Sequence, residues 1–211
     1  MKTIKAIIFD MDGVLIDARE WHYDALNKAL GLFGYRIDRF DHLVTYDGLP
    51  TRRKLEMLSL DAGLPRELHA FINEVKQKYT LEIVYTQCKP VFQHQFALSR
   101  LKEDDLRLVV ASNAVRATVA LMMEKSALAS YLEFTLSNQD VTRAKPDPDI
   151  YQIAIQRLGL TPRECLVVED NANGIKAAEA AGAHVMVVPS PDYVTYEAVR
   201  SRMREIEGDR P

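Results

Sequence analysis

FDMDGVLID, residues 9–17, places three acids within eight residues, directly after the apolar run IKAIIF at residues 4–9. The apolar run is β-branched and too short for a helix, so it predicts a buried strand. Asp10 and Asp12 then stand at the exposed end of this strand, and Gly13 allows the chain to turn sharply there. Acids in this position indicate a crevice, because open α/β sheets bind ligands beyond the carboxyl ends of their strands.

Short apolar runs alternate with longer helical patterns along the rest of the chain. In PDIYQIAIQRLGL, residues 148–160, apolar residues recur at helical spacing and Gly159 is a plausible stop. Strands that alternate with helices imply a parallel sheet covered on both faces, so we expect an α/β fold with a doubly wound, Rossmann-like core. The further predicted strands are LRLVVA (106–111), EFTLS (133–137), CLVVE (165–169) and HVMVV (184–188).

Residues 18–87 break this alternation, because they show helical patterns and no convincing strand. We expect them to form an all-helical cap domain, inserted into a catalytic core made of residues 1–17 and 88–211. The insertion would lie above the carboxyl end of the first strand, where open α/β sheets bind their ligands. In its first helix, the residues predicted to share one apolar face are Trp21, Ala25, Leu26, Ala29 and Leu32.

The composition is that of a soluble globular protein, with 47% hydrophobic and 27% charged residues in a chain of 211. The net charge of −3 and the scattered basic residues disfavour nucleic acid and anionic membranes as partners. No apolar stretch approaches the roughly 18 residues of a membrane span, and the pattern of a signal peptide is absent. Cys88 and Cys165 do not make a disulfide framework. We therefore expect a cytoplasmic protein, whose oligomeric state leaves no mark in the sequence.

Polar residues follow four of the predicted strands, at the strand end or in the loop that comes next. Because the carboxyl ends of parallel strands share one edge of a sheet, we expect these residues to converge on one site. They are Asp10 and Asp12 after the first strand, Ser112 and Asn113 after the second, Lys145 in the loop after the third, and Glu169 and Asp170 at the end of the fourth.

This set of residues resembles the four sequence motifs of the haloacid dehalogenase-like superfamily. DMDGVLID (10–17) is similar to the first motif, VVASN (109–113) to the second, Lys145 in AKPDPDIY (144–151) to the third, and VVEDNANGIKAAEAAG (167–182) to the fourth. The resemblance covers nearly the whole chain, with the motifs in the right order and spacing. The helical insertion resembles the small cap of the branch that contains β-phosphoglucomutase and sugar-phosphate phosphatases.

The resemblance implies chemistry through an aspartyl-phosphate. Asp10 would attack the phosphorus, and Asp12 would protonate the leaving oxygen and later take a proton from the attacking water. Ser112 and the main chain of Asn113 would hold the phosphoryl oxygens. A phosphate dianion repels a carboxylate by about 4 kcal/mol per pair of unit charges at ~4 Å and an effective dielectric of about 20, so the nucleophile needs positive partners. Lys145 supplies one of these charges.

A Mg²⁺ ion would supply two further positive charges through hard oxygen ligands. Asp12 also separates classes within the superfamily, because the metal-independent dehalogenases and the phosphonoacetaldehyde hydrolases do not keep an acid at that place. The sequence therefore favours metal-dependent phosphotransfer. The expected ligands of the ion are Asp10, the main-chain carbonyl of Asp12, and Asp170, with Glu169 in contact directly or through a water molecule.

Residues of the cap are candidates for contact with the substrate. His22 lies near the start of the first cap helix, where the mutase relatives place a histidine that faces the substrate; the alternative is a partly buried or surface histidine. Arg52 is a candidate for binding a second anionic group of the substrate; the alternative is a solvated arginine at a helix start. For Lys76, a surface position is favoured over a substrate contact.

Three functions remain open. The first is a Mg²⁺-dependent phosphatase that acts on a small phosphorylated metabolite, above all a sugar phosphate. The second is a phosphomutase of the β-phosphoglucomutase type; His22 fits it, but LPTR at residues 49–52 replaces the mutase's Val-Ser-Arg, and Ala18 replaces its usual threonine. The third, a catalytically silent protein that binds a phosphorylated metabolite, is disfavoured because no motif residue is lost. The motifs do not identify the ester, because cap residues select it.

Overall fold

The structure, a computed structural model, describes residues 4–46 and 48–208. The chain divides into two compact units, of which one is Met1–Asp17 with Lys89–Pro211 and the other is Ala18–Cys88. All strands of the described residues belong to the first unit, and the second unit is helical. The chain thus leaves the first unit shortly after its first strand and returns to it with a helix.

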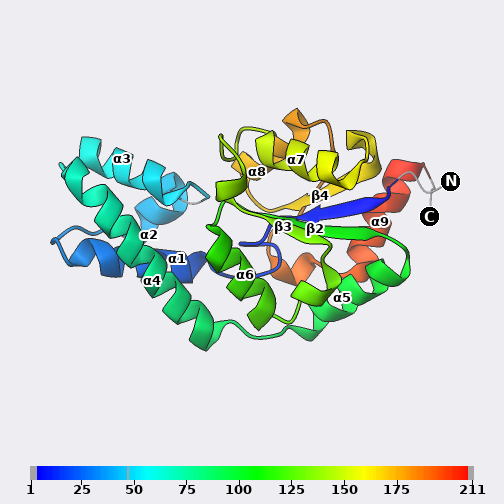
Figure 1. Ribbon diagram of the computed structural model, residues 1–211, viewed down its shortest axis with the longest axis horizontal. Helices are drawn as coiled ribbons and strands as arrows, with labels where there is room; N and C mark the ends of the chain where they lie inside the picture. The colour runs from blue at the N-terminus through cyan, green and yellow to red at the C-terminus, as the bar shows by residue number, and fades with distance from the viewer. Residues whose placement is uncertain (1–3, 47, 209–211) are drawn as a thin grey trace. The chain divides into compact units, whose positions relative to one another are not determined.

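A five-stranded parallel sheet forms the centre of the first unit (Figure 1). Its strands are β1 (Ala6–Phe9), β2 (Arg107–Ala111), β3 (Phe134–Leu136), β4 (Cys165–Glu169) and β5 (His184–Val187). Their spatial order is β3-β2-β1-β4-β5, and every neighbouring pair is parallel. Each predicted strand is present at its expected position, so the predicted α/β fold is confirmed.

Helices cover both faces of this sheet (Figure 1). One face carries α7 (Asp149–Leu158) and α8 (Ala172–Ala180), and the other carries α5 (Phe92–Glu103), α6 (Arg116–Lys125) and α9 (Tyr196–Glu207). Helix α7 buries Ile150, Ala154 and Leu158 and ends at Gly159 with φ 63°, as its helical spacing predicts. Short 3₁₀ turns complete the connections: η3 (Ala129–Tyr131), η4 (Asn138–Asp140), η5 (Pro162–Glu164) and η6 (Pro191–Tyr193).

The second unit contains α1 (Arg19–Gly31), α2 (Arg39–Asp41), the π-helical turn η1 (His42–Tyr46), α3 (Thr51–Asp61), the 3₁₀ turn η2 (Arg66–Leu68) and α4 (His69–Gln87). Helices α1 and α4 pack along each other. Ala25, Leu26 and Ala29 are buried as predicted, but Leu32 is 56% exposed and its prediction was wrong. The reason is that α1 ends before Leu32, so that Leu30 completes the buried face instead.

The order of the strands reverses at β1. The chain runs from β1 outwards through β2 to β3, and it then crosses to the opposite side of β1 to form β4 and β5. At such a switch point, neighbouring loops leave in opposite directions and open a crevice at the carboxyl ends of the strands. The main-chain N–H of Asp10 donates to the carbonyl of Val168 at 2.9 Å. The residues that follow Phe9 and Val168 are therefore held side by side.

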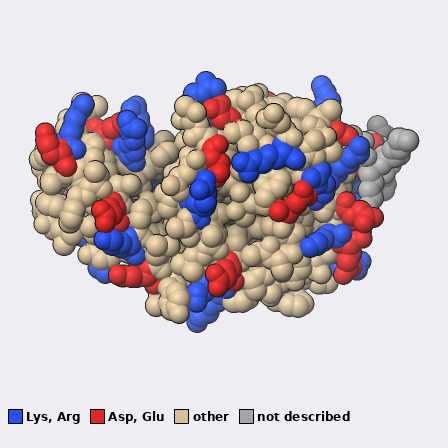
Figure 2. All heavy atoms as spheres, viewed as in Figure 1, with Lys and Arg blue, Asp and Glu red and all other residues tan. Residues whose placement is uncertain are grey.

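Charged side chains of both signs are interspersed over the surface seen in Figure 2. Among the charged residues that the structure describes, Arg143 lies 2.7 Å from Asp149, and Arg116 lies 2.9 Å from Asp140. Among the described residues, no helix has the length and apolar character to cross a bilayer.

Candidate active site

The loop after β1 is a tight turn that brings Gly13 against Asp170. The main-chain N–H of Gly13 donates to the carbonyl of Ile16 at 2.8 Å, and the N–H of Ile16 donates to the carbonyl of Met11 at 2.9 Å. Gly13 has φ 85°, a conformation that residues with a side chain rarely adopt. A Cβ atom at this position would lie 2.0 Å from Oδ2 of Asp170. Glycine therefore serves both the turn and the close approach of Asp170.

Three carboxylates gather at the carboxyl ends of β1 and β4. One oxygen each of Asp10, Glu169 and Asp170 lies within 4.8 Å of the others. Asp10 and Glu169 are buried, and Asp170 is half-buried. Carboxylate oxygens are the ligands that hard divalent cations prefer, so this group can hold a metal ion. The main-chain carbonyl of Asp12 as a further ligand stays a prediction.

Lys145 binds two of these acids at once. Its Nζ donates to Oδ1 of Asp10 at 2.6 Å, to Oε1 of Glu169 at 2.7 Å and to the carbonyl of Ala111 at 2.9 Å. These bonds use all three protons of the ammonium. Burial would lower the pKa of Lys145, but the charges of Asp10 and Glu169 outweigh burial, and the pKa lies above its usual value. Lys145 therefore stays positively charged at neutral pH.

The carboxyl of Asp10 has a pKa well above its usual value. Burial is the largest cause, the charges of Glu169 and Asp12 add to it, and Lys145 opposes it. A bound cation beside these acids would lower the pKa of Asp10 again and keep it ionised, as a nucleophile must be. The electrostatics of the cluster thus agree with a metal requirement.

Ser112 and Asn113 follow β2 and lie beside the loop that carries Lys145. Ser112 is buried, and its Oγ accepts from the main-chain N–H of Ala114 at 3.0 Å. Oδ1 of Asn113 accepts from the main-chain N–H of Lys145 at 3.2 Å, and its Nδ2 donates to the carbonyl of Lys145 at 3.4 Å. The side chain of Asn113 thus positions Lys145, a contact that the motifs do not indicate. Binding of phosphoryl oxygens by Ser112 and the main chain of Asn113 stays a prediction.

Tyr151 on α7 also belongs to this cluster, although the sequence analysis assigned it no role. Its hydroxyl donates to Oε1 of Glu169 at 2.6 Å, and its ring centroid lies 4.7 Å from Nζ of Lys145. The sequence did contain a signal for it: Tyr151, Ala154 and Leu158 share the buried face of α7. A buried tyrosine hydroxyl needs a polar partner, and the partner here is a motif residue.

In the helical unit, Lys76 is buried, so its predicted surface position was wrong. Lys76 lies four residues from Ile72 and from Thr80 on the buried stripe of α4, which encloses its aliphatic stem. Its Nζ lies 3.3 Å from Nδ1 of His22 on α1. The structure therefore pairs a buried lysine with the candidate histidine, and contact of His22 with a substrate stays a prediction.

Arg52 lies in the first turn of α3. Its side chain is 89% exposed, and its Nε donates to Oε1 of Glu56 at 3.2 Å. An exposed pair of this kind, one helical turn apart, contributes little to stability. The arrangement agrees with a solvated arginine at a helix start, and contact of Arg52 with a second anionic group of a substrate stays a prediction.

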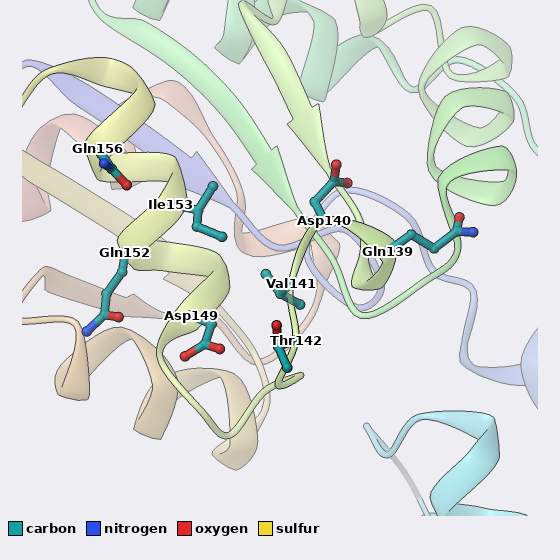
Figure 3. Close-up of a pocket in the computed structure, with 8 residues that line it drawn as sticks. All are labelled: Gln139, Asp140, Val141, Thr142, Asp149, Gln152, Ile153 and Gln156. Carbon is teal, nitrogen blue, oxygen red and sulfur yellow. The ribbon is translucent and has the colours of Figure 1, made fainter.

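A separate pocket of about 410 Å³ opens between α7 and the loop after β3 (Figure 3). The acids of this pocket, Asp149 and Asp140, are paired with arginines. The residues that line this pocket lack the combination of nucleophile, lysine and metal ligands that phosphoryl transfer needs. The candidate active site is therefore the acid cluster, which consists of Asp10, Glu169 and Asp170. The residues that line the pocket are Gln139, Asp140, Val141, Thr142, Asp149, Gln152, Ile153 and Gln156.

Comparison with known sequences places the motifs in a family. The sequence model of the haloacid dehalogenase-like hydrolases matches residues 7–188. Protein CbbY of Rhodobacter capsulatus is 31% identical over 196 residues, which cover 89% of this chain and 86% of that protein. A phosphorylated carbohydrates phosphatase of Thermotoga maritima is 27% identical over 184 residues, which cover 85% of this chain and 82% of that protein.

Solved structures share the fold. β-Phosphoglucomutase from Clostridium difficile has a TM-score of 0.83 at 20% identity, over 97% of this chain and 99% of that chain. CbbY from Rhodobacter sphaeroides, in complex with xylulose-(1,5)bisphosphate, has a TM-score of 0.79 at 24% identity, over 89% of this chain and 87% of that chain. At these identities the likeness concerns the fold. The sequence matches, together with the four motifs gathered at one sheet edge, establish that the chain belongs to the haloacid dehalogenase-like hydrolase family.

Proposed function

We propose that this protein is a Mg²⁺-dependent phosphatase that hydrolyses the phosphate monoester of a small metabolite, a sugar phosphate. The observation that carries the proposal is the buried ion cluster of Lys145 with Asp10 and Glu169 at the switch point of the sheet. It supports the proposal because it sets a cation beside Asp10, the proposed nucleophile, and because Asp10 and Glu169 form with Asp170 a group of carboxylates that can hold a metal ion. Family membership supports it, because relatives in the same family are named as phosphatases.

The proposed reaction has two steps. Asp10 attacks the phosphorus in line with the leaving oxygen, so that its bond to phosphorus forms as the ester P–O bond breaks, and Asp12 protonates the leaving oxygen. Water then attacks the aspartyl-phosphate, Asp12 takes its proton, and inorganic phosphate leaves while Asp10 is regenerated. Ser112 and the main chain of Asn113 bind the phosphoryl oxygens, and the positive charge of Lys145 offsets the repulsion between the two anions.

Asp10, Asp170 and the main-chain carbonyl of Asp12 are the proposed direct ligands of the Mg²⁺ ion. When bound, the ion supplies positive charge beside the nucleophile and the phosphoryl oxygens. Both oxygens of Glu169 already accept hydrogen bonds, from Lys145 and Tyr151 on Oε1 and from the N–H of Asp170 on Oε2. We therefore propose that Glu169 reaches the ion through a water molecule.

The names of relatives support a sugar phosphate as the substrate class. They include the phosphorylated carbohydrates phosphatase and probable pseudouridine-5′-phosphatases of Saccharomyces cerevisiae and Drosophila melanogaster. A phosphate ester on a sugar is common to these names. His22 and Arg52 are the proposed residues that select the ester. Each side chain can donate a hydrogen bond to a sugar hydroxyl or to a second phosphate. A cytoplasmic location without nucleic-acid or membrane partners stays a prediction.

The test is the release of inorganic phosphate from a panel of sugar 1- and 6-phosphates, pentose phosphates and nucleoside 5′-phosphates, with Mg²⁺ and with EDTA. Asp10→Asn removes the nucleophile, and Asp192→Asn changes an exposed acid of the same unit as a control. Mg²⁺-dependent release that Asp10→Asn abolishes and Asp192→Asn retains is the expected result. No release from any ester would refute the proposal.

A phosphomutase of the β-phosphoglucomutase type is the competing outcome, and it is favoured by His22 near the start of α1, where the mutase relatives place a histidine. The same panel distinguishes the two functions when a trace of sugar bisphosphate is added. Conversion of a sugar 1-phosphate to the 6-phosphate, without net release of inorganic phosphate, would identify a mutase. Net release that the bisphosphate does not alter identifies the phosphatase.

A further inference from the structure

The carboxylate of Glu169 is held by four hydrogen bonds. Its Oε1 accepts from Nζ of Lys145 at 2.7 Å and from the hydroxyl of Tyr151 at 2.6 Å. Its Oε2 accepts from the main-chain N–H groups of Asp170 at 3.2 Å and Asn171 at 3.4 Å. Because Glu169 is only 1% exposed, bulk water does not replace a lost partner. The hydroxyl of Tyr151 thus helps to fix the same oxygen that binds Lys145.

The ring of Tyr151 supports the lysine from a second direction. Nζ of Lys145 lies 4.7 Å from the ring centroid, within the range of a cation–π contact. Burial first, and then the charges of Glu169 and Asp10, raise the pKa of the Tyr151 hydroxyl well above its usual value. The hydroxyl therefore stays protonated at neutral pH and acts as a hydrogen-bond donor.

Helix α8 confines the carboxylate of Glu169 from another side. A Cβ atom at Gly174 would lie 1.7 Å from Oε1 of Glu169 and 2.4 Å from Oε2. Atoms this close cannot coexist, so glycine is required wherever Glu169 keeps this position. The carboxylate is thus enclosed between the hydroxyl of Tyr151 on α7 and the backbone of Gly174 on α8.

We propose that Tyr151 is a positioning residue for phosphoryl transfer: its hydroxyl fixes the Glu169 carboxylate, and this carboxylate and the Tyr151 ring together fix Nζ of Lys145 beside Asp10. The inference rests on the proposed function of the same site. Tyr151 acts through Lys145 and does not touch the substrate. A displaced cation weakens the stabilisation of transition-state charge more than it weakens the binding of the substrate, so kcat should respond more than KM.

Tyr151→Phe tests the proposal, because it removes the hydroxyl and keeps the ring. Tyr196→Phe is the matched control: the Tyr196 hydroxyl also donates to a carboxylate, Oδ2 of Asp104 at 2.9 Å, but Asp104 precedes β2 and so lies at the amino end of the sheet. On the best ester of the panel, we expect Tyr151→Phe to lower kcat about tenfold and to change KM less than about threefold. Tyr196→Phe should stay within about twofold of wild type in both constants.

Binding of inorganic phosphate, measured by calorimetry with Mg²⁺ present, gives a readout that is independent of turnover. We expect Tyr151→Phe to weaken this binding about threefold relative to Tyr196→Phe. Equal kcat and equal phosphate affinity in the two variants would overturn the positioning role and leave the phosphatase intact. A wild-type protein that neither hydrolyses an ester nor binds phosphate would instead overturn the proposed function, and the inference with it.

A double-mutant cycle separates positioning from a merely structural role. If Tyr151 acts through Glu169, the effect of Tyr151→Phe on kcat should shrink in a Glu169→Gln background, and a fully additive effect would count against the proposal. Gly174→Ala displaces Glu169 from the α8 side and serves as a second variant if Tyr151→Phe does not fold. Folded Gly174→Ala, verified by thermal unfolding, should lose at least about tenfold in kcat; unchanged kcat would overturn the proposal.

Discussion

Lys145 shows how charge is balanced around a single residue. A buried ammonium is unfavourable unless it is paired and hydrogen-bonded, and Lys145 meets two carboxylates and a carbonyl. Conversely, the pKa of Asp10 is already raised by burial and by the nearby charge of Glu169, and Lys145 is the group that opposes this. The lysine thus serves both the stability of the fold and the proposed chemistry.

Lys145→Met is expected to reduce both the stability of the fold and the rate of phosphoryl transfer. Removing one partner of a buried ion pair reduces the free energy of unfolding by about 3–5 kcal/mol. The loss of a cation at the phosphoryl group should lower kcat/KM at least about 100-fold. Mg²⁺ should restore part of the stability, because it brings positive charge to the same carboxylates. Urea unfolding in Mg²⁺ and in EDTA measures these effects, and unchanged stability in EDTA would contradict the account.

The position of an individual residue in the site could be predicted where the residue lies at the end of a strand. Asp10 follows β1, and Glu169 is the last residue of β4, which pairs with β1, so the sequence predicts that the two acids lie close together. Tyr151 could not be assigned a partner from the sequence, because its hydroxyl contact depends on how α7 packs against the sheet. Lys76 was misplaced because a lysine is exposed by default, whereas its spacing from Ile72 places it on a buried stripe.

At the scale of elements, β1 and β4 are tied together at their amino ends by Glu164, the last residue of the turn before β4. Nζ of Lys5 lies 2.6 Å from Oε1 of Glu164, and the main-chain N–H of Lys5 donates to its carbonyl at 2.8 Å. The N–H and hydroxyl of Thr161 both donate to Oε2 of Glu164 at 2.8 Å. These contacts support the pairing of β1 with β4, which brings Asp10 and Glu169 together at the opposite end.

Glu164→Gln should destabilise the protein at neutral pH and progressively less in acid. The pKa of Glu164 is lowered from 4.5 to about 2, first by the hydrogen bond from Lys5 and then by those from Thr161. Its carboxylate therefore stabilises the fold above a pH of about 4.5, and this contribution is lost as the pH falls towards 2. Thermal unfolding across this range should show the midpoints of wild type and variant converging. A difference that stays constant would contradict the assignment.

The positions of the strands could be predicted more closely than their ends. β4 has the predicted bounds, whereas β1 covers only Ala6–Phe9 of the predicted 4–9, β3 covers only Phe134–Leu136 of the predicted 133–137, and β5 ends one residue early, at Val187. A strand ends where its residues no longer find partners on a neighbouring strand, and local sequence does not encode this.

For the whole molecule, a metal bound at the acid cluster would couple the site to global stability. Asp10 and Asp170 lie far apart in the sequence and come together only in the folded chain, so an ion bound by both stabilises the fold over the unfolded state. Mg²⁺ at about 100 times its Kd should add about 2.7 kcal/mol to the free energy of unfolding of the wild type. Thermal unfolding should show a smaller shift for Asp170→Asn. Equal shifts in the two proteins would place the metal elsewhere.

The most direct test of the proposed mechanism is the detection of a phosphoryl group on Asp10. Wild-type protein is mixed with an isotopically labelled ester from the panel, quenched in acid within one turnover and digested, and the peptide that contains Asp10 is examined by mass spectrometry. We expect a labelled phosphoryl group on Asp10 in Mg²⁺, and none in EDTA or in Asp10→Asn. Hydrolysis of the ester by wild type without label on Asp10, or by Asp10→Asn at the wild-type rate, would contradict it.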